Sequence, residues 1–103
     1  MSESKRQKLL TVSDPSRVRR NLNKYLGPEI DLWVSDRKHK KYCVVHPTTL
    51  QKTHFGDIRY SDFTKHRDRD RQQNYLARAS AIKGAWRANR YSPNQLSINL
   101  LWQ

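Results

Sequence analysis

The chain has 103 residues, of which 35% are hydrophobic and 29% charged, and Lys and Arg outnumber Asp and Glu by 21 to 9. This length allows one small domain and excludes a large core, and the formal net charge of +12 favours an anionic partner such as nucleic acid, an anionic membrane surface or an acidic protein. The three Trp, five Tyr and two Phe must supply much of the buried surface.

Cysteine usage and hydropathy bear on the compartment. Cys43 is the only cysteine, which excludes an internal disulfide framework and suits a reducing compartment. No signal peptide is visible, and no apolar run reaches the roughly 20 residues that cross a bilayer. We therefore expect a protein that is not secreted.

The N-terminal part is predicted to contain one helix. Residues 1–13 are expected to form a flexible basic arm, and residues 14–103 a single domain. Asp14 and Pro15 are typical of a helix start, because Asp14 or Ser13 can cap free backbone N–H groups and Pro15 suits the first helical position. Gly27 should end this helix. Its apolar face is formed by Val18, Leu22, Tyr25 and Leu26.

The middle of the chain is predicted to form a small antiparallel β-meander. Apolar residues alternate from Ile30 to Val34, a second apolar run extends from Tyr42 to His46, and Lys52 to Phe55 is a candidate third strand. The connections between these segments are too short for parallel crossovers.

The C-terminal part is predicted to be helical again. An apolar stripe runs from Tyr75 to Ile82, with Asp68 or Asp70 in the first turn, where negative charge suits the helix dipole. A second helix should start at Ser92-Pro93. The predicted fold class is therefore α+β, a small antiparallel β-meander with one N-terminal and two C-terminal helices.

Positive charge is concentrated in the two predicted helical regions. Residues 1–27 carry a net charge of +5 and residues 58–103 carry +6, whereas residues 28–57 carry only +1. Basic residues at helical spacing present guanidinium groups in a row, and these bind phosphate oxygens through paired hydrogen bonds. Such a row is Arg67, Arg71, Asn74 and Arg78, on the side opposite Tyr75. A solvated face, partly neutralised by Asp68, explains the same spacing.

Two further basic clusters are candidates. Arg17, Arg20 and Lys24 lie together, away from the apolar face of their helix. The turn from Arg37 to Lys41 can reach into a groove, can resemble a nuclear localisation signal as Lys5 to Lys8 does, or can simply keep the chain soluble. The residues predicted to bind a polyanion are Arg17, Arg20, Lys24, Arg37, Lys38, Lys40, Lys41, Arg67, Arg71 and Arg78.

Neither metal binding nor catalysis is expected. The spacing of His39, Cys43 and His46 suits a helix or loop, but this segment is predicted to be a strand. No nucleophile elbow and no phosphate-binding glycine loop is present. The group His54, Asp57, Asp62 and His66 is compatible with a small nuclease, although Asp62 equally suits a turn cap. We expect no cofactor, no metal and no small-molecule substrate.

Aromatic residues interleave with Arg from Phe55 to Trp102, as they do in proteins that stack single-stranded bases. Because aliphatic residues are few, most of these rings are expected in the core.

One segment resembles a known family. The carrying residues are His54-Phe55-Gly56, Tyr60, and Asp62-Phe63-Thr64-Lys65-His66-Arg67-Asp68, followed by Arg71, Tyr75, Arg78, Trp86, Ser92-Pro93 and Leu100-Leu101-Trp102. Over roughly residues 40–103 the chain resembles small basic proteins of unassigned function encoded by large double-stranded DNA viruses of eukaryotes. Gln72, Gln73 and Asn74 depart from that pattern where more charge is expected. The resemblance implies a viral protein packaged in the particle.

The leading prediction is a non-enzymatic virion structural protein, a minor capsid or sub-capsid component. The expected partners are capsid or other virion proteins, with DNA or an anionic membrane surface as further polyanions. The segments predicted to dock a partner are Leu9, Leu10, Leu100, Leu101 and Trp102. The expected location is the virion, and the host cytoplasm or nucleus during assembly. The alternative is a non-specific nucleic-acid-binding or genome-condensing protein.

Overall fold

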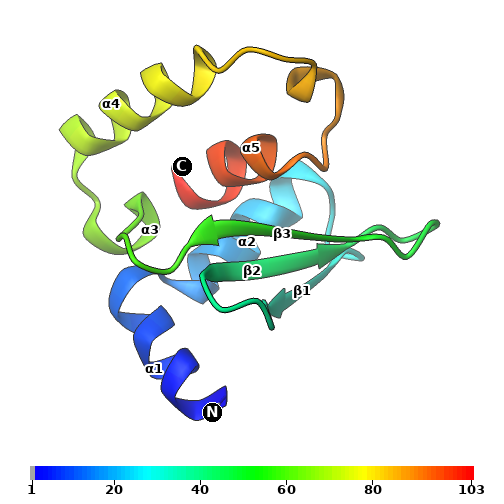
Figure 1. Cartoon of the computed structure of the whole chain (residues 1–103), viewed down its shortest axis with the longest axis horizontal. Coiled ribbons are helices and arrows are strands. Elements are labelled where there is room, and N and C mark those ends of the chain that lie inside the picture. Colours follow the sequence, from blue (N-terminus) through cyan, green and yellow to red (C-terminus); the bar gives the residue numbers. More distant parts are fainter. Residues whose placement is uncertain (1) are drawn as a thin grey trace.

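The computed structural model describes residues 2–103, with side chains from residue 5 onward. It confirms the α+β class: a three-stranded antiparallel sheet is combined with helices from the N-terminal and C-terminal parts of the chain (Figure 1).

The first helix, α1 (Ser2–Val12), corrects the prediction of a flexible arm over residues 1–13, of which Met1 lies outside the described residues. Leu9 and Val12 are one helical turn apart and are both buried in the core. The end of α1 is fixed because the backbone N–H of Asp62 donates to the carbonyl of Val12 at 2.9 Å. Two buried apolar side chains give too weak a periodic pattern to predict a helix from sequence.

Helix α2 (Pro15–Tyr25) begins as predicted. The Asp14 carboxylate accepts hydrogen bonds from the backbone N–H groups of Ser16 and Arg17. Val18 and Leu22 are fully buried, and this face of α2 packs against the C-terminal helical segment.

The sheet consists of β1 (Asp31–Val34), β2 (Lys40–Val45) and β3 (Lys52–Asp57), in that spatial order. All neighbours are antiparallel, which confirms the predicted meander. Trp33, Cys43 and His54 are aligned across the three strands. The loop between β2 and β3 extends beyond the rest of the domain (Figure 1).

The C-terminal part contains more elements than the two predicted helices. The elements are α3 (Phe63–His66), α4 (Arg69–Ser80), the 3₁₀ turn η1 (Trp86–Ala88), α5 (Pro93–Leu96) and the π-helical η2 (Ser97–Leu101), which continues α5. The acidic residue predicted in the first turn of α4 is Asp70, while Asp68 is the N-cap. The predicted helix start at Ser92-Pro93 is confirmed, with Ser92 as the N-cap of α5. Helix α4 ends at Ser80, before the end of the predicted apolar stripe, so Ile82 lies beyond the helix and is exposed.

The core is formed where α2, the sheet and the α5–η2 segment meet. Its most buried side chains are Leu9, Val18, Leu22, Tyr42, Val44, Phe55, Leu96, Leu100 and Leu101, with Trp102 at its edge. Four of the five residues predicted to dock a partner therefore belong to this core: Leu9, Leu100, Leu101 and Trp102. They are buried because the apolar C-terminal segment completes a core that has few other aliphatic residues. Only Leu10 is exposed.

Within residues 2–103, no helix has both the length and the apolar character that spanning a bilayer requires.

Candidate functional site

Most of the predicted polyanion-binding residues line one of two hollows. The first, which we call the basic cleft, has a volume of about 490 Å³ and lies between α2, the residue after α3 and the end of the chain. Its lining residues are Arg17, Arg20, Asn21, Lys24, Tyr25, Arg67, Asn99 and Gln103.

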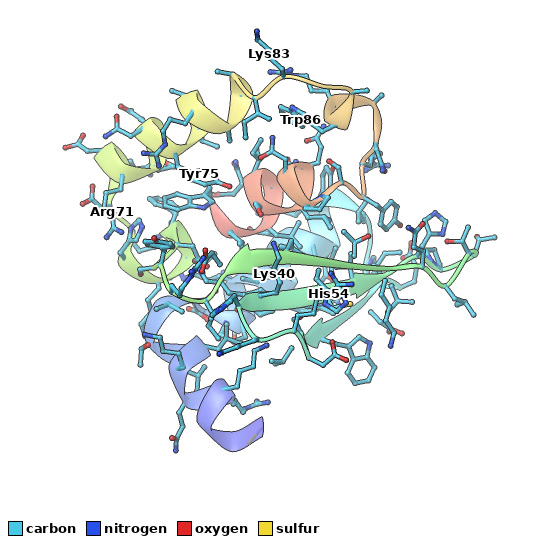
Figure 2. The ribbon with its side chains drawn as sticks, in the orientation of Figure 1. Lys40, His54, Arg71, Tyr75, Lys83 and Trp86 are labelled. Carbon is cyan, nitrogen blue, oxygen red and sulfur yellow. The ribbon has the colours of Figure 1, made fainter. Side chains whose placement is uncertain are left out.

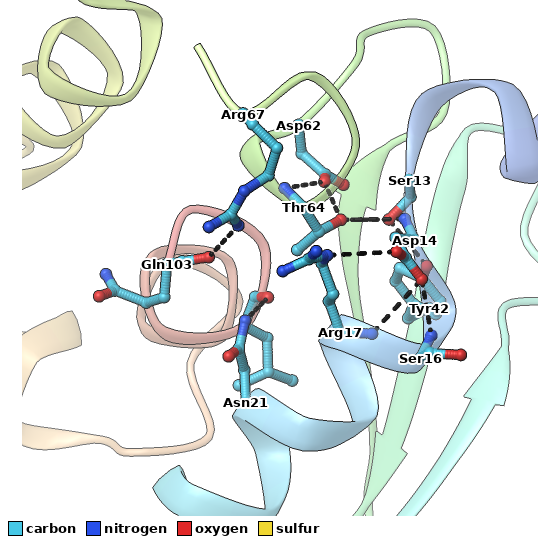
Figure 3. Close-up of polar contacts among 11 residues, drawn as sticks. Ser13, Asp14, Ser16, Arg17, Asn21, Tyr42, Asp62, Thr64, Arg67 and Gln103 are labelled. Carbon is cyan, nitrogen blue, oxygen red and sulfur yellow. Dashed lines mark hydrogen bonds and ion pairs between the residues drawn. The ribbon is translucent and has the colours of Figure 1, made fainter. Parts of the chain in front are cut away.

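Helical spacing and packing together create the basic cleft. Arg17, Arg20 and Lys24 occupy one side of α2 because its other side, carrying Val18 and Leu22, is buried. The amide of Asn21 donates to the carbonyl of Leu100 at 2.8 Å and holds α2 against the C-terminal segment (Figure 3).

Arg67 reaches the same cleft from the opposite side. It adopts the left-handed backbone conformation, with φ of 57°, where α3 ends. Its guanidinium group lies 4.2 Å from the centre of the Phe63 ring, and it donates to the backbone carbonyl of Gln103 at 3.4 Å (Figure 3). A cation over an aromatic face is held in place without losing its charge.

The electrostatic character of the basic cleft is strongly positive. No Asp or Glu is among the described residues that line it. Asp14, at the start of α2, lies 3.4 Å from the Arg17 guanidinium, but both side chains are well exposed, so this pair is weak. Within residues 5–103, the side chains of Arg20 and Lys24 make no ion pair. The cleft therefore presents at least two uncompensated cations to an anion.

The second hollow, which we call the aromatic groove, has a volume of about 670 Å³ and lies between α4 on one side and β2, β3 and α5–η2 on the other. Its main cations are Lys40, Arg71 and Arg78, and its rings are Tyr60, Tyr75 and Trp102. Figure 2 shows Tyr75 reaching from α4 toward the C-terminal helix, with Arg71 on the same helix.

Few contacts hold α4 above this groove. The Tyr75 and Trp102 rings stack with centroids 4.2 Å apart and planes 7° from parallel. The side-chain amide of Gln72 donates to the carbonyl of Trp102 at 2.8 Å, and that of Asn94 donates to the carbonyl of Ala79 at 3.1 Å. Ala79 is the only fully buried residue of α4. The helix therefore covers a hollow rather than packing directly on the sheet.

The structure divides the predicted arginine row. Arg67 lies before α4 in a left-handed conformation and lines the basic cleft, whereas Arg71, Asn74 and Arg78 line the aromatic groove. The row was also expected opposite Tyr75, but Tyr75 lines the same groove. Helical spacing failed here because the helix is interrupted at Arg67.

Lys41 is a second correction among the predicted polyanion-binding residues. It is buried, and its ammonium group lies 2.9 Å from the Asp62 carboxylate. Burial lowers the pKa of Lys41, while the adjacent Asp62 carboxylate opposes that shift. Arg37 and Lys38 are exposed in the β1–β2 turn and line neither hollow.

Sequence reasoning missed three polar contributors to these hollows. Asn99 and Gln103 join the basic cleft only because the C-terminal segment folds back along α2. Tyr60 belongs to the aromatic residues of which most are expected in the core, but it is 66% exposed at the aromatic groove. Its position beside Arg59, in a polar turn after β3, was the available signal.

The residues considered for a nuclease do not form one site. Each is engaged with a residue outside the group. The His54 ring nitrogen Nδ1 lies 2.7 Å from the Ser35 hydroxyl, and the Asp57 carboxylate binds the Arg59 guanidinium at 2.8 Å. Arg59 lowers the pKa of Asp57 to about 2. Asp62 binds Lys41, as described above. Within the described chain, no cluster of three His, Cys, Asp or Glu side chains could hold a metal ion.

Comparison with known proteins gives one match. No curated protein and no solved structure matches the chain. Residues 30–79 match the model of a family described as a family of unknown function (DUF5754), a span from β1 to nearly the end of α4 that is just under half of the chain. This span carries Lys40, Tyr60, Arg67, Arg71 and Arg78, but not the α2 side of the basic cleft. Over these residues the chain is similar to a family with no assigned function.

Proposed function

We propose that this chain is a non-enzymatic nucleic-acid-binding protein that holds the phosphate backbone in the basic cleft. The observation that carries the proposal is the convergence of Arg17, Arg20 and Lys24 with Arg67 around one hollow whose described lining contains no carboxylate. Neutralising phosphates with such cations releases condensed counterions, which is the main driving force of non-specific nucleic-acid binding.

The shape of the site favours nucleic acid over a membrane surface. Proteins that bind anionic lipid typically combine exposed cations with apolar side chains that enter the acyl boundary. The basic cleft is concave, and besides its cations it is lined by the polar side chains of Asn21, Asn99 and Gln103. Amide side chains and arginine forks suit phosphate and sugar oxygens.

A virion structural role is the second candidate. The prediction of that role drew on the family resemblance and on apolar docking residues, of which only Leu10 is exposed. Other exposed apolar side chains support it: Trp33 and Val34 are exposed on β1, which is an edge strand of the sheet. Such an edge is a surface on which a neighbouring protein can pack. Mass spectrometry of purified virus particles tests this role, which requires that the chain be found and crosslinked to a neighbour.

The nucleic-acid proposal is tested by fluorescence anisotropy with a labelled oligonucleotide at low salt. Arg20→Glu combined with Lys24→Glu should weaken binding at least tenfold, because each reversal replaces an attraction with a repulsion. The matched control reverses Lys8 and Lys83, which are exposed and outside both hollows. Lys83 points away from the domain (Figure 2).

Equal weakening by the two double reversals would mean that only net charge matters and that the basic cleft is not the site. Absence of binding to single strands and to duplex at low salt would refute the proposed function.

A further inference from the structure

The aromatic groove differs chemically from the basic cleft. Its wall includes Tyr60, Ile82, Leu101 and Trp102, so it offers an apolar surface that a phosphate backbone alone does not use. Tyr60 is 66% exposed and Ile82 is 50% exposed. Exposed apolar groups of this size inside a hollow indicate a ligand with an apolar part.

Cations surround that apolar wall. Lys40, Arg71 and Arg78 line the groove, and within residues 5–103 none of the three makes an ion pair. Among the described lining residues the only carboxylate belongs to Asp57, which Arg59 already holds at 2.8 Å. A ligand for this groove therefore carries negative charge beside its apolar part.

Amide groups provide the third element. Asn74 lies in the groove, and its side chain makes no hydrogen bond to the described residues. Asn94 uses its amide nitrogen on the Ala79 carbonyl, which leaves its oxygen as an acceptor. Asn side chains hydrogen-bond the edges of nucleobases.

The two hollows are lined in part by residues that are close in sequence. Trp102 lines the aromatic groove and Gln103, the next residue, lines the basic cleft. Arg67, at the end of α3, lines the cleft, and Arg71, in the first turns of α4, lines the groove. On this arrangement we expect a strand whose phosphates lie in the cleft to extend a neighbouring nucleotide toward the groove.

We propose that the aromatic groove receives an unpaired base, so that the partner of this chain is single-stranded nucleic acid. This inference rests on the proposed function, because the basic cleft supplies the phosphate contacts. The base lies against Tyr60 and Ile82, its edge meets Asn74, and its phosphate meets Arg71 and Arg78. A base in a duplex cannot enter without first leaving the stack, which costs free energy.

The test compares three ligands: a single strand, an abasic strand of the same length, and the corresponding duplex. The abasic strand keeps the phosphates but lacks the rings. The unmodified chain should bind the intact strand at least about fivefold more tightly than the abasic strand, the lower end expected for stacking of one base. Tyr60→Ala should remove this preference and leave duplex and abasic binding unchanged.

Matched controls come from exposed side chains elsewhere. Trp33→Ala removes an aromatic ring that is 60% exposed on β1, outside the groove, and should keep the preference for the intact strand. Ile82→Ser should reduce the preference, whereas Leu50→Ser, in the exposed β2–β3 loop, should not.

Failure of this inference is distinguishable from failure of the proposed function. Equal affinity for intact and abasic strands, with both still weakened by Arg20→Glu and Lys24→Glu, overturns the base-binding role and leaves the basic cleft as a phosphate site. A preference that survives Tyr60→Ala and Ile82→Ser also overturns it. If the unmodified chain binds none of the three ligands, both proposals are overturned.

Discussion

The ammonium group of Lys41 lies 2.9 Å from the carboxylate of Asp62, and the two side chains are 3% and 1% exposed. Asp62 also accepts a hydrogen bond from the backbone N–H of Thr64 at the start of α3, and it contacts the Thr64 hydroxyl. Thr64 in turn lies 3.3 Å from the Ser13 hydroxyl, which accepts a hydrogen bond from Tyr42 at 2.8 Å. This buried polar network joins the α1–α2 junction, β2 and α3. Lys41 therefore stabilises the fold.

Removing the Lys41 ammonium group should destabilise the protein strongly. Lys41→Met leaves the Asp62 charge buried without its partner, and such a loss costs about 3 kcal/mol or more. Lys40→Met, at the next and less buried position, should change the free energy of unfolding by less than about 1 kcal/mol. Urea denaturation measures both. Similar costs for the two substitutions would show that Lys41 is not buried as described.

The integration of α1 into the core can be tested with adjacent leucines. Leu9 is 1% exposed and Leu10 is 45% exposed. Leu9→Ala should lower the free energy of unfolding by about 2–4 kcal/mol because it leaves a cavity. Leu10→Ala should cost less than about 1 kcal/mol. If thermal and urea denaturation give equal small effects, residues 1–13 form the flexible arm that the sequence predicts.

The stacked pair Tyr75–Trp102 should couple α4 to the C-terminal segment. A double-mutant cycle with Tyr75→Leu and Trp102→Leu isolates the contribution of ring stacking, which we expect to be about 0.5–1.5 kcal/mol. Additive costs in urea denaturation would mean that the two rings do not stack in solution. A loss of coupling would also free α4 to move relative to the groove that it covers.

Stability should fall when the solution becomes mildly acidic. The Nδ1 atom of His66 accepts a hydrogen bond from the Asp68 backbone N–H at 3.0 Å, and its Nε2 atom is buried with no hydrogen-bond partner among the described residues. Burial, followed by the nearby Arg71 charge, lowers the pKa of His66 below its ordinary value of 6.5. Burial also lowers the pKa of His54. Because the unfolded chain then binds protons more readily, stability is complete above pH 6.5 and decreases below it.

The variant that tests this pH dependence is His66→Asn, whose side-chain oxygen can replace Nδ1 as the acceptor. Its unfolding midpoint should depend less on pH between neutrality and mild acid than that of the unmodified chain. Identical pH profiles for the two proteins would mean that groups other than His66 cause the pH dependence of stability.

Local chemistry made much of the fold predictable. The caps at Asp14, Asp68 and Ser92 lie beside the N–H groups that they satisfy, so neighbouring residues suffice to identify them. The alternation in β1 and the breaks around β2 and β3 are equally local, and the meander follows from short connections.

The unpredicted features depend on contacts between distant residues. The burial of Lys41 depends on its ion pair with Asp62, a residue that follows β3 in the chain. Arg67 leaves the predicted arginine row because α3 ends there in a left-handed conformation. The C-terminal Leu100 and Leu101 look like docking residues in sequence, but the small core uses them. For the same reason the basic cleft could not be assembled from sequence, since its walls are α2 and residues more than forty positions later.

The most direct test of the central claim is the salt dependence of binding to single-stranded nucleic acid. The logarithm of the binding constant should fall linearly with the logarithm of salt concentration, with a slope set by the number of phosphates neutralised. Arg20→Gln with Lys24→Gln should reduce the magnitude of that slope by about 1.4, whereas Lys8→Gln with Lys83→Gln should leave it nearly unchanged. A flat dependence, or equal reductions for the two pairs, would contradict phosphate binding in the basic cleft.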